Sequence, residues 1–165
     1  MDALQECVIE YKNQLEKGKI QKAYKGILEY LMALRTHFEK SYPDWLVPGG
    51  LYTGYMDMSY FSIIPPSMKE KKLKIAVVFI HEACRFEVWL AGVNKGVQAD
   101  YWQKIKKSGW NEYQTVATLQ GADAIIEHVL AASPDFDNLE GLTKLLQDGT
   151  IRFIEKIEKF LLTIE

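Results

Sequence analysis

Charged and aromatic side chains alternate along residues 85–90, a segment whose pattern is typical of a β-strand. The alternation places Arg85, Glu87 and Trp89 on one face of this strand. Charged groups close to the interior of a sheet cost free energy unless they are paired or put to use. An arginine between carboxylates can hydrogen-bond with each of them, and such a group can bind a polar or charged small molecule.

Another predicted strand contributes further polar side chains to this group. Tyr55, Asp57 and Ser59 share one of its faces if no bulge intervenes. If this face coincides with the first one, we expect a polar sheet face that binds a ligand, with His81 at its edge. The predicted ligand-binding residues are Tyr55, Asp57, His81, Arg85, Glu87 and Trp89.

A purely structural explanation of the same residues stays open, and the sequence favours it. Opposite charges at neighbouring positions of a half-exposed sheet stabilise each other without any ligand. In that case Arg85 and Glu87 simply form an ion pair.

An enzyme that uses a divalent metal is the alternative function. Nucleases of the PD-(D/E)xK type hold Mg²⁺ with an Asp and with the Glu of a Glu-x-Lys triplet on adjacent strands. Asp57 is a candidate for the first ligand and Glu87 for the second, although no lysine follows Glu87 at the required spacing. Residues 70–72 have the required letters but lie in a charged loop. The alternative is therefore a metal-dependent nuclease- or phosphodiesterase-like enzyme using Asp57 and Glu87.

Other catalytic patterns are incomplete in this sequence. His81 and Glu82 begin the H-E-x-x-H motif of zinc proteases, but Arg85 stands where the second histidine is needed. Cys84 lies near His81 in sequence, yet a strand turn does not by itself bring the two side chains together. No G-x-S-x-G elbow or phosphate-binding glycine loop is present. We expect no metal and no cofactor.

The composition is typical of a folded cytoplasmic protein. The chain has 165 residues, of which 48% are hydrophobic and 25% charged, and a net charge of −2. Trp102, Trp110 and nearby lysines resemble a nucleic-acid surface, but the acidic balance argues against that partner. No signal-peptide pattern is present, and no apolar run reaches the roughly 20 residues of a membrane helix. We therefore expect a cytoplasmic protein, without membrane contact, whose Cys7 and Cys84 are reduced.

The order of elements follows from apolar periodicity. Helices are predicted for residues 3–17, 20–40, 97–107, 122–132, 137–147 and 150–161, and strands for 51–64, 73–80, 85–90 and 110–118. The strand at 73–80 is apolar on both faces, which predicts helices on both sides of the sheet. The tight turn that follows predicts antiparallel pairing. The fold class is therefore α+β, with one domain over residues 1–165. It has a mainly antiparallel three- to four-stranded sheet, with an N-terminal helical hairpin and C-terminal helices packed on it.

Long stretches of the chain resemble a known family. These are YPDWLVPGGLYTGYMDMSYFSIIPPSMKEKKLKIAVVFIHEACRFEVWLAGVNKGVQADYW and EYKNQLEKGKIQKAYKGILEYLMALR, together with the C-terminal helices. They are similar to small bacterial proteins described only as a domain of unknown function. The resemblance implies a bacterial cytosolic single domain, and it assigns no activity and no site residues.

The sequence thus leaves the biochemical role open. We expect a ligand-binding or protein-interaction module with a polar sheet face, whose partner is a small polar ligand or a protein. Homodimerisation through an edge strand or an aromatic patch is a further expectation.

Overall fold

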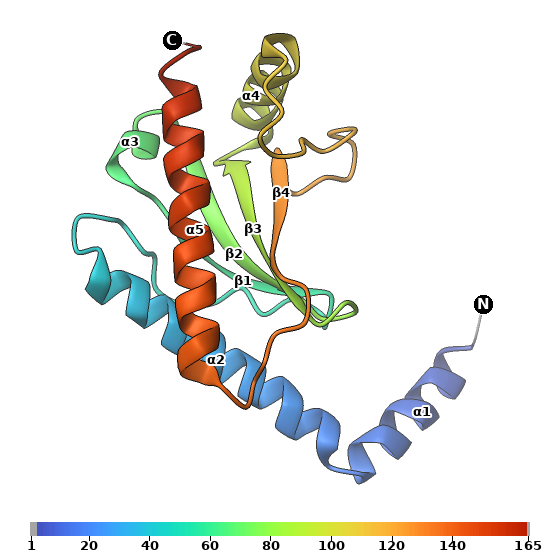
Figure 1. Ribbon diagram of the computed structural model, residues 1–165. Coiled ribbons are helices and arrows are strands. Elements are labelled where there is room, and N and C mark those ends of the chain that lie inside the picture. The colour runs from blue at the N-terminus through green and yellow to red at the C-terminus, as the bar shows by residue number, and fades with distance from the viewer. Residues whose placement is uncertain (1–2, 165) are drawn as a thin grey trace.

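Four strands form one antiparallel sheet in the order β1-β2-β3-β4 (Figure 1). The computed structural model describes residues 3–164 of the chain. The strands are β1 (Met58–Ile63), β2 (Leu73–Ile80), β3 (Arg85–Gly92) and β4 (Ile126–Ala131). Each strand pairs with the next one along the sequence, so the sheet is a meander. The predicted α+β class with an antiparallel sheet is confirmed.

Five helices accompany this sheet within the described residues. They are α1 (Leu4–Glu16), α2 (Lys19–Ser41), α3 (Pro66–Lys69), α4 (Lys95–Ser108) and α5 (Leu139–Leu161). Helices α2 and α5 cover one face of the sheet (Figure 1) and enclose the main core. Leu34 and Phe38 of α2 and Phe153 and Ile157 of α5 are buried there. Within residues 3–164, none of the helices combines the length and the apolar character needed to cross a membrane.

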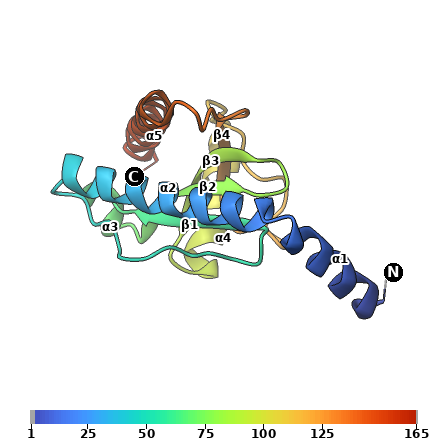
Figure 2. The same cartoon turned by 90° about the horizontal axis from the view of Figure 1, so that it is seen from below.

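The opposite face of the sheet carries a smaller apolar cluster. Ala76, Val78 and Trp89 lie on this face, and Ala124 from the irregular segment before β4 packs against them. Helix α4 lies on the side of the sheet away from α5 (Figure 2). The buried Ile105 of α4 nevertheless belongs to the main core, and it is the irregular segment with Ala124 that packs on this face of the sheet. Both faces of β2 are buried, which is why its sequence is apolar at nearly every position.

The predicted N-terminal helix pair is present, but only α2 packs on the sheet. The two helices meet at Gly18, which has a φ of +76° that glycine adopts readily. Helix α1 extends away from the rest of the chain (Figures 1 and 2), and none of its residues is buried. Its apolar stripe does not contribute to the core.

Strand β4 stands where the sequence predicts a helix at 122–132, so that prediction was wrong. Apolar residues at 125, 126, 129 and 130 fit a helical stripe, but this segment pairs with β3. The pairing buries Ile126 and Ala131 and leaves Glu127 and Val129 exposed, as in an edge strand with one covered face. Pairing with a distant strand has outweighed the local helical pattern. The strand predicted at 110–118 was also wrong, because this segment is irregular and makes a single bridge from Thr115 to Ile126.

Helix α5 is continuous where the sequence predicts two helices interrupted at Gly149. The glycine does not end the helix. A Cβ at Gly149 would lie 2.7 Å from the Cδ2 atom of Leu130 on β4. The end of the Leu130 side chain occupies the space that a Cβ at this position would take.

Strand β1 is shorter than the predicted strand at 51–64. The chain before it turns back on itself, so that Tyr52 pairs with Tyr60. Gly54 lies in this turn with a φ of +67°, and its ideal Cβ would lie 2.2 Å from the carbonyl oxygen of Met58. This close backbone approach at Gly54 shortens the strand.

Candidate functional site

Glu87 accepts a hydrogen bond on each of its carboxylate oxygens from its own strand. The Arg85 Nε donates to one oxygen at 2.8 Å and the Trp89 indole nitrogen to the other at 2.9 Å. All three side chains lie on one face because they are two residues apart, as the sequence predicts. The Glu87 residue is only 4% exposed, whereas the Arg85 side chain is 41% exposed. The Arg85 side chain therefore neutralises a buried carboxylate while reaching solvent itself.

Strand β4 adds Glu127 to the same face. In the register of β3 and β4, Glu127 lies opposite Trp89 and Val129 lies opposite Glu87. Although Glu127 as a whole is an exposed residue, desolvation of its carboxyl group raises the pKa of that group. The negative charges of Glu87 and, to a smaller extent, Asp123 raise the pKa of Glu127 further. Glu127 is therefore a carboxyl group whose charged form lacks full compensation.

Asp123 and Tyr60 complete a small acidic region on this face. Burial raises the pKa of the Tyr60 hydroxyl, and the charges of Tyr52 and Asp123 add to that shift. Asp123 thus acts on both Tyr60 and Glu127. We call Tyr60, Arg85, Glu87, Trp89, Asp123 and Glu127 the acidic sheet face. It carries three carboxyl groups against one arginine.

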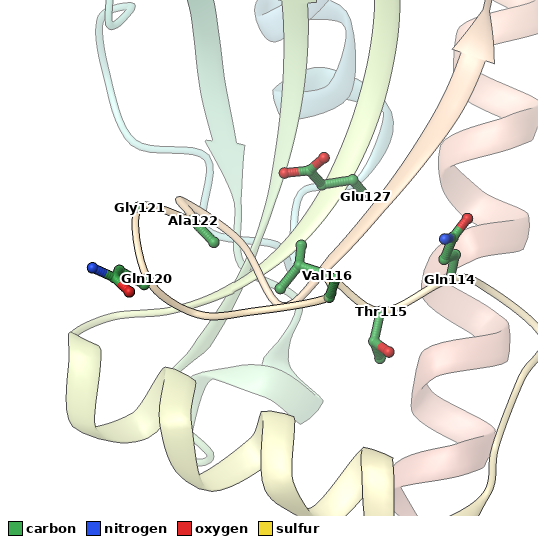
Figure 3. Close-up of a pocket in the computed structure, with 8 residues that line it drawn as sticks. Gln114, Thr115, Val116, Gln120, Gly121, Ala122 and Glu127 are labelled. Carbon is green, nitrogen blue, oxygen red and sulfur yellow. The ribbon is translucent and has the colours of Figure 1, made fainter.

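A cavity of about 420 Å³ opens beside Glu127 (Figure 3). The irregular segment between α4 and β4 forms most of its wall, and Glu127 on β4 forms the rest. Gln114 and Gln120 lie toward opposite ends of this loop, with Val116 between them. We call this space the loop cavity. It is lined by Gln114, Thr115, Val116, Ala117, Gln120, Gly121, Ala122 and Glu127.

Hydrogen bonds to the backbone of this loop hold the cavity wall in place. The Trp102 indole nitrogen donates to the carbonyl of Val116 at 2.8 Å, and the Gln98 amide donates to the carbonyl of Ala122 at 3.3 Å. The backbone N–H of Val116 also donates to Ile125 at 2.9 Å. Trp102, which resembles a nucleic-acid contact in the sequence, therefore uses its polar atom to fix the loop.

Asp57 and Tyr55 do not join this face in the way that the strand pattern predicts. Asp57 lies before β1 and accepts a hydrogen bond from the backbone N–H of Tyr55 at 2.9 Å. Tyr55 is 93% exposed. Arg85 and Trp89, the hydrogen-bond partners of Glu87, are on its own strand. Asp57 therefore does not form the predicted charged group with Arg85 and Glu87. The register places Ser59 opposite Phe79 on the core face, which is the reason for the difference.

His81 instead meets Ser59 at the end of β2. The Ser59 hydroxyl donates to the carbonyl of Thr53 at 2.6 Å, and it lies 2.8 Å from the His81 Nε2 atom. A hydroxyl has one proton, so His81 must donate from Nε2 to the Ser59 oxygen. Burial lowers the pKa of His81, and the nearby Asp57 charge opposes that shift. This pair cannot act as a serine nucleophile with its base, because the serine is fully buried and the histidine is the donor.

Tyr60, Asp123 and Glu127 are not among the site residues predicted from the sequence. Glu127 lies in the segment predicted as a helix, so its place beside Trp89 could not be foreseen. The sequence carries no strand-like alternation here, because the apolar Val129 is exposed and His128 is half-buried.

The two carboxylates of the metal-dependent alternative belong to different local structures. Asp57 binds the backbone of its own turn, and Glu87 is saturated by Arg85 and Trp89. Across residues 3–164, no three His, Cys, Asp or Glu side chains gather closely enough to hold a metal ion. The arrangement of these residues gives no support to a metal-bound phosphodiester site.

Comparison with known proteins identifies the family and no further relative. No curated protein matches the chain. No solved structure matches it either. A family model described as Domain of unknown function (DUF7000) matches residues 4–161. Because that match covers nearly the whole sequence, the resemblance noted in the sequence is confirmed, and the chain belongs to the DUF7000 family.

Proposed function

We propose that this protein is a binding module for a small polar ligand that carries a cationic group, an amine or a guanidinium. The ligand occupies the loop cavity, with its cation against Glu127 and the acidic sheet face. The observation that carries the proposal is the raised pKa of Glu127 at the wall of the cavity. Groups with perturbed pKa values in a cavity are frequent at functional sites.

The charge balance supports a cationic ligand. Arg85 is hydrogen-bonded to Glu87 at 2.8 Å, and its charge offsets only part of the upward shift in the pKa of Glu127. Burial and the charge of Glu87 raise the pKa of Glu127, so a ligand cation would replace a repulsive environment with an attractive one. Binding would therefore lower the pKa of Glu127 and release a proton at a pH close to that pKa.

The size and lining of the cavity support a small ligand. Its volume of about 420 Å³ lies in the lower part of the range of small-molecule sites, which is roughly 300–1,000 Å³. Gln114 and Gln120 each provide an amide that can donate and accept hydrogen bonds. The hydrogen bonds from Trp102 and Gln98 hold the loop in one conformation before binding, which limits the entropy lost on association.

Titration of the ¹⁵N-labelled protein with agmatine tests this function. Agmatine carries an amine and a guanidinium, and butyrate serves as an anionic probe of similar length. We expect agmatine, but not butyrate, to shift the amide signals of residues 114–122. Glu127→Gln should weaken the response at least tenfold. The matched control Glu155→Gln removes an exposed carboxylate on α5 and should leave the response unchanged.

Two results would contradict the proposal. The first is an equal response to agmatine and butyrate. The second is a response to agmatine that survives in Glu127→Gln, which would place the ligand elsewhere.

The proposal includes a cytoplasmic location in a bacterial cell. The support for this compartment is the state of the cysteines, since Cys7 and Cys84 are both free and exposed. Free exposed thiols are typical of a reducing compartment. Thiol labelling of the protein in intact cells tests it, and extensive disulfide formation there would contradict it.

A further inference from the structure

Residues 3–164 leave the apolar stripe of helix α1 largely uncovered, with only Leu15 half-buried. Leu4, Val8, Tyr11 and Leu15 recur at spacings of three and four and so share one side of the helix. None of the α1 residues is buried, and the helix extends away from the body of the protein (Figures 1 and 2). An isolated helix of 13 residues is only marginally stable in water. Docking of this stripe on another surface would therefore stabilise α1.

A mostly apolar groove lies beside the first half of α2. It has a volume of about 490 Å³. Ala23, Gly26 and Ile27 of α2 form one side, and Phe136 and Leu139 from the segment that leads into α5 contribute to the other. We call this space the α2 groove. It shares no lining residue with the loop cavity, so it is independent of the function proposed above.

Gly26 marks the α2 groove as a place of close approach. Glycine in the interior of a helix costs roughly 1 kcal/mol relative to alanine. A Cβ at Gly26 would have nothing within 4 Å, so no neighbour within residues 3–164 requires a glycine at this position. A glycine kept at such a position allows another backbone to come close to the helix.

The stripe of α1 and the floor of the α2 groove match in length. Eleven positions separate Leu4 from Leu15, and eleven separate Lys19 from Tyr30. A helix rises about 1.5 Å per residue, so each surface is about 17 Å long. One α1 helix can therefore occupy the whole groove.

The two surfaces also match in charge. Helix α1 carries Glu6, Glu10 and Glu16 against the single Lys12. Lys19 and Lys22 line one end of the α2 groove. The helix as a whole is therefore acidic and the groove rim is basic, which favours this pairing over association of two acidic α1 helices with each other.

We propose that two copies of this chain exchange their α1 helices. In this dimer, α1 of each copy lies in the α2 groove of the other around a two-fold axis. Within one chain, α1 extends away from the body of the protein and leaves the α2 groove open to the helix of a second copy (Figures 1 and 2). The two-fold arrangement makes both contacts at once and so doubles the buried area.

Sedimentation velocity over a dilution series tests the exchange. We expect a reversible dimer for the unmodified chain. Val8→Glu puts a charge into the stripe and should yield a monomer. Ile9→Glu is the matched control, because Ile9 is equally exposed, at 51% against 48% for Val8, and lies on another side of α1. It should leave the dimer intact.

A second variant blocks the groove without touching α1. Gly26→Leu fills the groove floor, and nothing in the folded monomer stands in its way. We expect it to abolish the dimer while circular dichroism and thermal unfolding show a folded monomer. Lys25→Leu places the same side chain on another side of α2 and should keep the dimer.

Cross-linking separates exchange from docking within one chain. Cys7 lies beside the stripe of α1, and Lys22→Cys adds a thiol at the groove rim in a Cys84→Ser background. Oxidation should give a disulfide-linked dimer. An intrachain disulfide in a monomer would overturn the proposal. A chain that stays monomeric at every concentration, or a dimer unaffected by Val8→Glu and Gly26→Leu, would overturn it as well.

Discussion

The Trp89 indole donates a hydrogen bond of 2.9 Å to Glu87, two residues before it on β3. Arg85 donates to the other carboxylate oxygen from two residues before Glu87. Two residues of the same strand, one on each side of Glu87, thus satisfy a carboxylate whose side chain is only 5% exposed. This local arrangement forms the centre of the acidic sheet face.

Replacement of Glu87 by Gln should destabilise the protein. The change removes the ion pair but keeps an oxygen that can accept the hydrogen bond from Trp89. Loss of one partner of a fully buried pair costs about 3–5 kcal/mol. Since the Arg85 side chain is 41% exposed and can be solvated, we expect a smaller loss of about 1–2 kcal/mol in the free energy of unfolding. Urea denaturation at neutral pH measures it.

Glu127→Gln on the same face is the control for this experiment. It should leave the free energy of unfolding unchanged or raise it at neutral pH, since the charge of Glu127 lacks full compensation. If Glu87→Gln is also neutral, the ion pair does not stabilise the fold, and the charge of Glu87 is kept for binding.

The raised pKa of Glu127 predicts a pH dependence of stability. The folded state holds this proton up to a higher pH than the unfolded state, whose value is near 4.5. Stability should therefore fall as the pH rises from about 4.5 through the pKa of the folded state. Glu127→Gln should remove this part of the dependence. NMR titration of the Glu127 side-chain carboxyl measures the pKa directly, and a value below 4.5 would contradict the structure.

The hydrogen bond between His81 and Ser59 predicts both a tautomer and a pKa. Burial lowers the pKa of His81 below 6.5, so the unfolded state takes up a proton more readily. Stability should then decrease as the pH falls from about 6.5 through the lower pKa of the folded state. The imidazole ¹⁵N shifts should show a proton on Nε2 at neutral pH. A proton on Nδ1 would contradict the donor role assigned to His81.

Two interior helix glycines should respond in opposite ways to alanine. Gly26→Ala meets open space and should raise the free energy of unfolding by about 0.5–1 kcal/mol. Gly149→Ala places a Cβ 2.7 Å from Leu130, so Leu130 must move. We expect Gly149→Ala to be less stable than Gly26→Ala by about 0.5–1.5 kcal/mol, the cost of moving the flexible Leu130 side chain off its rotamer.

Removal of the Leu130 side chain tests this explanation. In a Leu130→Ala background the space beside Gly149 is empty, and Gly149→Ala should then stabilise α5 as Gly26→Ala stabilises α2. Thermal unfolding of Gly149→Ala, Leu130→Ala and the double variant, each compared with the unmodified chain at a concentration where all are monomeric, measures this dependence. A Gly149→Ala effect that does not depend on Leu130 would refute the close contact.

The sequence predicts the centre of the sheet well because its signals are local. The turn at 81–84 joins β2 to β3, and the alternation of Arg85, Glu87 and Trp89 depends only on the strand period. The sheet edges depend on distant partners. The sequence pattern of residues 126–131 predicts a helix, but these residues pair with β3. The pattern around Asp57 predicts a strand, but the chain turns at Gly54.

The candidate site was half predictable for the same reason. Arg85, Glu87 and Trp89 lie on one strand, so their shared face follows from their spacing. Glu127 reaches Trp89 only through the register of β3 and β4, which no local pattern specifies. Gly149 led to the wrong prediction of a break in α5. A single sequence does not distinguish a glycine that ends a helix from one that leaves room for Leu130.

The order of the strands also bears on how the chain folds. Contacts between β1, β2 and β3 are short in sequence and form quickly, because little chain entropy is lost in closing their turns. The link from β3 to β4 runs through α4 and the irregular loop, so closing it takes longer. We therefore expect β4 to join last. A folding intermediate that lacks β4 would have β1, β2 and β3 paired and no loop cavity, so ligand binding would report only on fully folded molecules.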